Sequence, residues 1–297
     1  MNEISIIIPV YNEKNAILPT IDHVLEIMNV SDITYEIVIV NDGSTDGTGD
    51  ILQQRKAQVK IVQHLVNKGY GASIKTGIRR ARYENIAITD ADSTYPNDRI
   101  PELFKELQEN DMVIGARSFS KLPAKTKPAK WVINKLANYI AKERIPDINS
   151  GLRLFKKAAF EPFLPIIPNG FSLTTTITLG MVTGGFDVKF IPIQYFEREG
   201  KSKIKPIKDT LRFLKLLLKI GLYIAPLKIF IPFGIGVFIL GTAWGAFSWF
   251  YLGKFADAST IIILMTSLQI MLLALIAELI NHRTPSFYKK FNQDKQP

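Results

Sequence analysis

The chain has 297 residues, of which 47% are hydrophobic, and it carries a formal net charge of +10. This length is enough for one substantial domain with additional elements, and the positive charge suits nucleic acid, an anionic membrane or a phosphorylated substrate. The absence of cysteine excludes disulfides and thiolate metal sites. The three histidines, His23, His64 and His282, are far apart and show no zinc-like spacing, and no signal peptide is expected, because a strand-like run begins almost at once.

Residues 1 to about 200 alternate strand-like and helix-like stretches. Strands are predicted at residues 4–10, 36–40, 59–62, 85–89 and 111–115, and helices over about 14–29, from a cap at Asp46 or Thr48, and over 71–82. This order predicts an α/β domain with a mostly parallel sheet and helices on both faces. Polar clusters follow three strands, at residues 11–13, 41–43 and 90–92. Since ligands bind at the carboxyl ends of such strands, we expect one shared site.

The cluster Asp90-Ala91-Asp92 carries the sharpest chemical signal. Two carboxylates one residue apart at a strand end point the same way. They suit a hard divalent cation that keeps positions open for diphosphate oxygens. In isolation the same residues would be read as a solvated turn, and the neighbouring clusters favour the metal interpretation.

Three further polar segments are candidates for binding. In residues 40–48, Asp42 is predicted to accept hydrogen bonds from a nucleobase or ribose, although a capped strand-to-helix turn is the alternative. Residues 67–71 combine Lys68 with two glycines before a helix, where the amino terminus favours phosphate, but the P-loop pattern is absent. Residues 147–153 are either a turn into a strand or a part of the site, and residues 198–203 are either a linker or a phosphate-gripping loop.

The composition changes after about residue 205. Residues 229–253 and 258–277 contain no charged side chain, and each stretch is long enough to cross a hydrocarbon core of roughly 30 Å as a helix. Two buried core helices are the alternative, but these stretches show almost no polar stripe. Residues 249–251, Trp-Phe-Tyr, suit an interfacial belt.

Basic residues flank both spans on the sides away from their connection. The positive-inside rule therefore places both termini and the first domain in the cytoplasm. Within residues 206–226, a basic stripe lies opposite an apolar stripe, which predicts a helix in the membrane interface, with an ordinary surface helix as the alternative. The predicted organisation is a domain over residues 1–205, an interfacial helix over 206–226, a hairpin over 229–280 and a tail over 281–297. Nucleic acid is disfavoured, since membrane proximity accounts for the charge.

Taken together, these motifs resemble a known family. They are Pro9-Val10-Tyr11-Asn12-Glu13, the Asn-Asp-Gly-Ser-Thr-Asp-Gly-Thr run at 41–48, Asp90-Ala91-Asp92, Gly115-Ala116-Arg117, Ser150-Gly151-Leu152-Arg153 and residues 198–203. The chain resembles family 2 glycosyltransferases with the GT-A fold. More narrowly, it is similar to the polyprenyl-phosphate glycosyltransferases, the group that includes dolichyl-phosphate mannose synthase. The resemblance covers roughly residues 4–203, and the apolar hairpin matches a subgroup of that family.

The resemblance implies roles for individual residues. The donor nucleotide would be held by Pro9, Tyr11, Glu13, Asp42, Lys68 and Asp90, and Mg²⁺ or Mn²⁺ by Asp90 and Asp92. Arg117 would face the acceptor phosphate, and Ser202 and Lys203 would close over the phosphates. Because two anionic reactants must be brought together, other cations are further candidates for binding the acceptor phosphate: Lys130, Arg153 and Arg198. The catalytic residues would be Asp92, Arg117 and Lys203. One departure concerns residues 93–96, Ser-Thr-Tyr-Pro, where mannose synthases commonly have Leu-Gln-His-Pro. Thr94 or water would then replace the glutamine near the metal, which weakens an assignment to GDP-mannose.

The predicted function is a metal-dependent, inverting transfer of a hexose from a nucleotide sugar to a polyprenyl phosphate, undecaprenyl or dolichyl, at the cytoplasmic face of the cell membrane. UDP-glucose or another UDP-hexose is the first choice of donor and GDP-mannose the second. The Gln-x-x-Arg-Trp motif of processive synthases is absent, so polymer synthesis is not expected. The alternatives are transfer to another membrane lipid such as diacylglycerol, and a non-catalytic subunit that binds nucleotide sugar. A homo-oligomer is compatible with the sequence.

Overall fold

The structure is a computed structural model that describes residues 2–117, 135, 137–141, 144–170, 172–196, 215, 218, 221–222, 225–253 and 258–283. The chain forms two compact units, Met1–Phe213 and Leu214–Pro297. The predicted interfacial helix at 206–226 and tail at 281–297 lie almost entirely outside the described residues, so these parts of the predicted organisation stay predictions.

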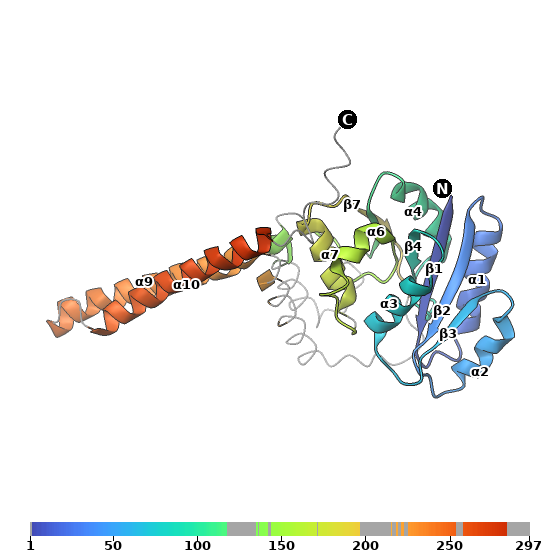
Figure 1. Cartoon of the computed structure of the whole chain (residues 1–297), viewed down its shortest axis with the longest axis horizontal. Helices are drawn as coiled ribbons and strands as arrows, with labels where there is room; N and C mark the ends of the chain where they lie inside the picture. The colour runs from blue at the N-terminus through green and yellow to red at the C-terminus, as the bar shows by residue number, and fades with distance from the viewer. Residues whose placement is uncertain are drawn as a thin grey trace. The chain divides into compact units, whose positions relative to one another are not determined.

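The first unit alternates strands and helices (Figure 1). Its elements are β1 (Glu3–Val10), α1 (Ile17–Asn29), β2 (Thr34–Asn41), α2 (Thr48–Leu52), η1 (Gln53–Arg55), β3 (Lys60–Gln63), α3 (Tyr70–Arg80), β4 (Asn85–Ile88), η2 (Asn97–Arg99), α4 (Ile100–Leu107), β5 (Met112–Arg117), β6 (Arg153–Lys156), α6 (Lys157–Phe160), η5 (Glu161–Phe163), α7 (Leu173–Thr183) and β7 (Val188–Ile193).

The strands form one seven-stranded sheet in the order β3-β2-β1-β4-β6-β5-β7. Every neighbouring pair is parallel except the two that involve β6, which runs antiparallel to both β4 and β5. Six strands therefore point one way and β6 alone points the other way. As a result, the first residue of β6 lies at the same sheet edge as the last residues of β4 and β5.

Helices cover both faces of the sheet because the strands are apolar on both sides. Ile4, Ile6 and Ile8 of β1 belong to a core cluster that includes residues of α1 and α4. Ile7 points the opposite way and meets α3, where a Cβ placed on Gly77 would lie 2.5 Å from the Ile7 side chain. Strands that are buried on both faces are typical of mostly parallel sheets. The predicted α/β fold is thus confirmed.

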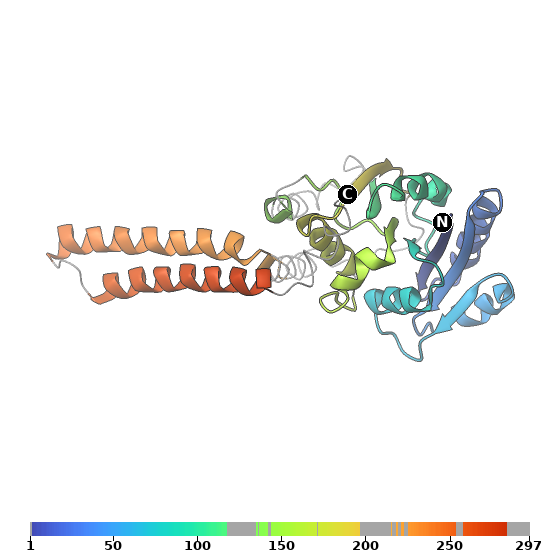
Figure 2. The same cartoon turned by 45° about the horizontal axis from the view of Figure 1, so that its top comes forward.

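The second unit contains the helices α9 (Pro226–Leu252) and α10 (Ala258–Arg283), which lie side by side (Figure 2). Their backbones approach closely because glycines line the contact: a Cβ on Gly245 would lie 2.7 Å from Thr260 Cγ2. Both helices are long and apolar enough to cross a membrane, and only 11% and 17% of their most apolar windows are buried. Such exposure of apolar side chains is unlike that of core helices in a globular protein.

The predicted element boundaries differ from the structure by a few residues. Helix α1 begins at Ile17 rather than near residue 14, because the amides of Ala16 and Ile17 both donate to the carbonyl of Glu13 and close a turn there. Helices α9 and α10 extend beyond the predicted spans, to Pro226 and Arg283. Proline is favourable in the first turn of a helix, where its missing amide hydrogen has no partner to lose.

Candidate active site

The predicted polar segments meet at one edge of the sheet. Strands β1, β2, β4 and β5 end there, at Val10, Asn41, Ile88 and Arg117, and the reversed strand β6 begins there at Arg153. The clusters that follow these strands are consequently neighbours in space although they are far apart in sequence. This edge is the position at which open α/β sheets bind ligands.

Asp90 and Asp92 lie directly after β4. The hydroxyl of Tyr70 donates to Asp90 Oδ1 over 3.1 Å, and the hydroxyl of Thr94 donates to Asp92 Oδ1 over 2.6 Å. Burial, together with the nearby charge of Asp92, raises the pKa of Asp90 to about 6. Two carboxylates that repel each other in a partly buried position form a donor set that a hard divalent cation would neutralise.

The hydrogen bond from its hydroxyl makes Thr94 the residue that holds the Asp92 carboxylate in place. It is 1% exposed, and its carbonyl also accepts the amide of Phe196, which follows β7. Among the residues that the structure describes, no group of three or more His, Cys, Asp or Glu side chains could hold a metal ion. A cation held by Asp90 and Asp92 would keep coordination positions open for water or for a bound diphosphate.

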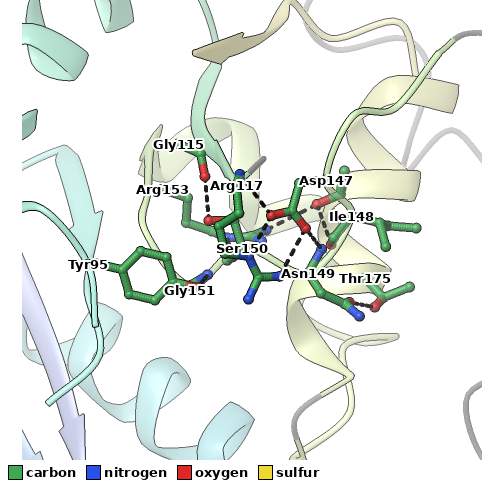
Figure 3. A network of polar contacts seen from close by, with 11 residues as sticks. Tyr95, Gly115, Arg117, Asp147, Ile148, Asn149, Ser150, Gly151, Arg153 and Thr175 are labelled. Carbon is green, nitrogen blue, oxygen red and sulfur yellow. Dashed lines mark hydrogen bonds and ion pairs between the residues drawn. The ribbon is translucent and has the colours of Figure 1, made fainter. Parts of the chain in front are cut away.

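Arg117, the last residue of β5, forms a two-pronged ion pair with Asp147 (Figure 3). Its Nε and Nη2 donate to the two carboxylate oxygens over 2.7 Å and 3.0 Å, and the guanidinium carbon lies 5.2 Å from the ring centre of Tyr195. Burial by itself would lower the pKa of Arg117, but Asp147 raises it above its ordinary value. Arg117 is therefore a permanent cation that is fixed in orientation, with 27% of its side chain exposed.

The ion pair between Arg117 and Asp147 should make the unfolding free energy depend on pH in acid. Burial alone would raise the pKa of Asp147, but the hydrogen bonds and charge of Arg117 hold it below its ordinary value. The folded pKa is then lower than the unfolded pKa of about 3.9, so this stabilisation is complete above about pH 4 and is lost as the pH falls through the folded value. We expect Asp147→Asn to lower the unfolding free energy at pH 7 by about 3 kcal/mol and to flatten its decline in acid.

Thermal unfolding of the full chain in detergent between pH 3 and pH 7 measures this effect. Asp50→Asn, which changes an exposed carboxylate of α2, is the matched control and should behave like the unaltered chain. An Asp147→Asn chain whose stability fell in acid as steeply as that of the unaltered chain would contradict the assignment.

Arg153 differs from the prediction in its surroundings. The side chain is 0% exposed, and Nε and Nη2 both donate to the carbonyl of Ser150 (Figure 3). Its Nη1 donates to the carbonyl of Thr174 and the hydroxyl of Thr178 in α7, over 3.1 Å and 3.2 Å. Arg153 is not positioned to bind a phosphate, because its donors are directed to protein oxygens and its side chain has no exposed surface. We therefore do not retain it among the direct acceptor ligands.

Asp42 is also deeply buried, at 3% exposed. Its Oδ1 accepts from His64 Nδ1 and from the amide of Lys68, over 2.7 Å and 2.9 Å, and Oδ2 accepts from the amide of Gly69 over 2.8 Å. His64 is held from its other side by the Thr76 hydroxyl, 3.0 Å from Nε2. Asp42 thus ties the loop before α3 to the end of β2, and only its remaining acceptor capacity is left for a ligand.

The loop after β1 is bound to the loop after β2. The amides of Asn12, Glu13 and Lys14 donate to the side chains of Ser44, Thr48 and Asp46, respectively. Pro9 is buried within β1, whereas the ring of Tyr11 is 42% exposed at the sheet edge. Much of the motif at 41–48 therefore shapes the loops, and Tyr11 is left exposed directly after β1.

Four predicted site residues, Lys130, Arg198, Ser202 and Lys203, lie outside the described residues. Conversely, several residues that shape the site were not predicted to do so: His64, Tyr70, Tyr95, Asp147 and Tyr195. Tyr95 accepts the amide of Gly151 over 2.7 Å and packs edge-on against Tyr195. The sequence signal for Asp147 was its place in the segment 147–153, but nothing there indicated Arg117 as its partner.

Comparison with known proteins identifies the family. Residues 5–164 match the profile described as Glycosyl transferase family 2. The chain belongs to this family. Residues 225–282, which contain α9 and α10, match the GtrB C-terminal hairpin. The family predicted from the motifs is thus confirmed, and the hairpin match agrees with the expectation of membrane association.

Several relatives resemble the chain over more than half of its length. The low-salt glycan biosynthesis hexosyltransferase Agl6 of Haloferax volcanii is 27% identical over 254 residues, which cover 83% of this chain and 59% of that protein. An undecaprenyl-phosphate 4-deoxy-4-formamido-L-arabinose transferase of Photorhabdus laumondii is 27% identical over 59% of this chain and 58% of its own length. The corresponding transferase of Pseudomonas syringae is 27% identical, with coverages of 82% and 72%. The chain therefore spans under two thirds of the first two relatives.

A solved structure shares the fold. Glucosyl-3-phosphoglycerate synthase of Mycobacterium tuberculosis, crystallised with Mn²⁺, UDP and glucosyl-3-phosphoglycerate, superposes with a TM-score of 0.58 at 16% identity. The match covers 74% of this chain and 80% of the synthase.

Proposed function

We propose that the chain transfers a hexose from a nucleotide sugar to a polyprenyl phosphate at the surface of a membrane. The observation that carries this proposal is the meeting of an acidic pair, Asp90 and Asp92, with the fixed cation Arg117 at one sheet edge, in a family 2 chain that ends in an apolar hairpin. The names of the relatives from Photorhabdus laumondii and Pseudomonas syringae support undecaprenyl phosphate as the acceptor.

Asp90 and Asp92 would hold Mg²⁺ or Mn²⁺. The raised pKa of Asp90 supports this assignment, because it reflects the burial and mutual repulsion that a bound cation relieves. When bound, the cation would stabilise the charge that develops on the departing nucleoside diphosphate. The Mycobacterium tuberculosis synthase that shares the fold was crystallised with Mn²⁺ and UDP, which agrees with this choice of ion and with a uridine donor.

The donor nucleoside would lie beside Pro9, Tyr11, Glu13, Asp42 and Lys68. The exposed ring of Tyr11 and the remaining acceptor capacity of Asp42 support a planar base at this position. UDP-glucose or another UDP-hexose is the first choice and GDP-mannose the second, since Thr94 stands where mannose synthases commonly have glutamine.

The acceptor would be a phosphate monoester, whose second pKa of about 6 leaves it mostly dianionic at neutral pH. Such a nucleophile needs no general base, so the protein has to supply cations that bring two anions together. Arg117 is the described residue best suited to this task, and Lys130, Arg198, Ser202 and Lys203 are proposed to assist it. A single in-line displacement would invert the sugar carbon.

The hairpin α9–α10 would anchor the chain where the lipid resides. The basic flanks of the two spans support a cytoplasmic position for both termini and for the first unit. The anchoring does not depend on the sugar or on the length of the polyprenol.

The test uses isolated membranes that contain the chain. They are incubated with Mg²⁺ and a panel of radiolabelled nucleotide sugars and then extracted for labelled lipid. We expect label in a lipid from which mild acid releases the sugar, since a glycosyl phosphate is acid-labile and a glycoside is not. Acid-stable label in diacylglycerol would favour the other lipid acceptor, and the absence of both transfer and donor hydrolysis would favour a non-catalytic subunit.

A further inference from the structure

Gly151 lies against the carboxylate of Asp90. A Cβ placed on Gly151 would come within 2.6 Å of Asp90 Oδ2 and within 3.0 Å of Oδ1. The φ angle of Gly151 is not in the left-handed region, so its backbone would accept any residue. A side chain at this position would therefore have to displace the Asp90 carboxylate, which fills the space that glycine leaves.

The turn that carries Gly151 is fixed by three independent contacts (Figure 3). The amide of Gly151 donates to the Tyr95 hydroxyl over 2.7 Å, and the Ser150 hydroxyl donates to the carbonyl of Gly115 over 2.5 Å. The guanidinium group of Arg153 donates to the carbonyl of Ser150 from both Nε and Nη2. The peptide that supports Asp90 is thus held from three sides.

Arg153 is an unusual means of holding a turn. A fully buried cation loses its hydration, and this loss lowers the pKa of Arg153. Within the part of the chain that the structure describes, no carboxylate forms an ion pair with it. Its bonds go instead to the carbonyls of Ser150 and Thr174 and the hydroxyl of Thr178, which join the turn to α7. The guanidinium group presents five donors in a rigid planar fork that suits these bonds, whereas an ammonium group has three donors on a single atom.

We propose that Gly151 and Arg153 are positioning residues for the divalent-cation site: Gly151 leaves the space in which the Asp90 carboxylate lies, and Arg153 fixes the turn that defines that space. The inference rests on the proposed cation site at Asp90 and Asp92. It replaces the predicted contact of Arg153 with the acceptor phosphate by a role that acts through Asp90.

Direct titration of the purified full chain in detergent with Mn²⁺, followed by the loss of the free-ion EPR signal, tests the proposal without relying on turnover. We expect Gly151→Ala to weaken Mn²⁺ binding by about 10–100-fold, the usual effect of losing a partner that orients a metal ligand. Gly170→Ala is the matched control, because a Cβ there meets nothing within 4 Å, and it should bind Mn²⁺ like the unaltered chain. Equal affinity of the Gly151→Ala chain would overturn the role of Gly151.

The variant Arg153→Lys distinguishes the hydrogen-bonding geometry of the guanidinium group from its positive charge. Lysine keeps the positive charge but lacks the rigid planar fork that joins Ser150 to Thr178, so we expect weaker Mn²⁺ binding by about tenfold. Binding as tight as in the unaltered chain would overturn the role of Arg153.

A double-mutant cycle measured by Tm tests the contact between Gly151 and Asp90 even if Gly151→Ala destabilises the fold. If the added methyl group collides with Asp90, Gly151→Ala should lower Tm in the unaltered chain but hardly at all in an Asp90→Ala chain. Equal losses in both would show that the collision is elsewhere and would overturn the inference. Failure of the unaltered chain to bind Mn²⁺ would instead refute the cation site itself, while the double-mutant cycle would still report on the contact between Gly151 and Asp90.

Discussion

Asp92→Asn is expected to reduce sugar transfer by about 10³-fold while leaving the fold intact. The substitution keeps the size of the side chain and an oxygen that can accept from Thr94, but it removes one of the two charges proposed to bind the cation. If the cation contributes about 4 kcal/mol of charge stabilisation, its loss corresponds to about 10³ in rate. The measurement is transfer of labelled sugar to polyprenyl phosphate over a range of Mg²⁺ and Mn²⁺ concentrations.

Asp98→Asn is the matched control for this experiment. Asp98 is an exposed carboxylate in η2, and its loss should leave the rate and the metal dependence unchanged. Full activity of the Asp92→Asn chain, or full activity of the unaltered chain in excess chelator, would remove the basis for the metal assignment.

Arg117→Lys is expected to affect the acceptor far more than the donor. Lysine keeps a positive charge beside Asp147 but cannot form the two-pronged pair, so the cation at this position loses its fixed orientation. A hydrogen bond between charged groups contributes about 1.5–3 kcal/mol, which corresponds to a decrease of about 10–100-fold in kcat/KM for polyprenyl phosphate. Donor binding, measured by titration with the nucleotide diphosphate, should change little.

Arg99→Lys, which alters another arginine that is paired with a nearby carboxylate, Glu102, should leave both parameters as they are. A loss of donor affinity equal to the loss in acceptor use would reassign Arg117 to the donor phosphates. Comparing Tm with that of the unaltered chain separates either result from unfolding, since the ion pair with Asp147 also stabilises the fold.

Local patterns predicted the sheet and its functional edge. Isoleucine-rich runs located β1, β2 and β4, and the polar residues that follow each of them predicted Asp42, Asp90 and Asp92 at one edge, which the parallel pairing brings about. Periodicity and strand ends are local properties, so a single sequence contains the information. The two apolar spans were predictable for the same reason.

The pairing partners were not predictable in this way. Arg117 and Asp147 are 30 positions apart, and nothing in either segment indicates the other. Arg153 was predicted to bind the acceptor phosphate because it is one of the cations that could bring two anionic reactants together, yet its side chain is buried under the turn before it. Which way a side chain points from the first residue of a strand depends on the partner strands, and the reversed direction of β6 was not evident from the four residues that form it.

That reversed strand has a consequence for the order in which the molecule is built. Strands β1 to β4 precede β5 in the sequence, but β6, which lies between β4 and β5 in the sheet, is synthesised after both. A nascent chain that has reached β5 already possesses the acidic pair, but the peptide beneath Asp90 is still missing. We therefore expect the proposed cation site to be completed only when residues 150–153 join the sheet, after β1 to β4 have been synthesised.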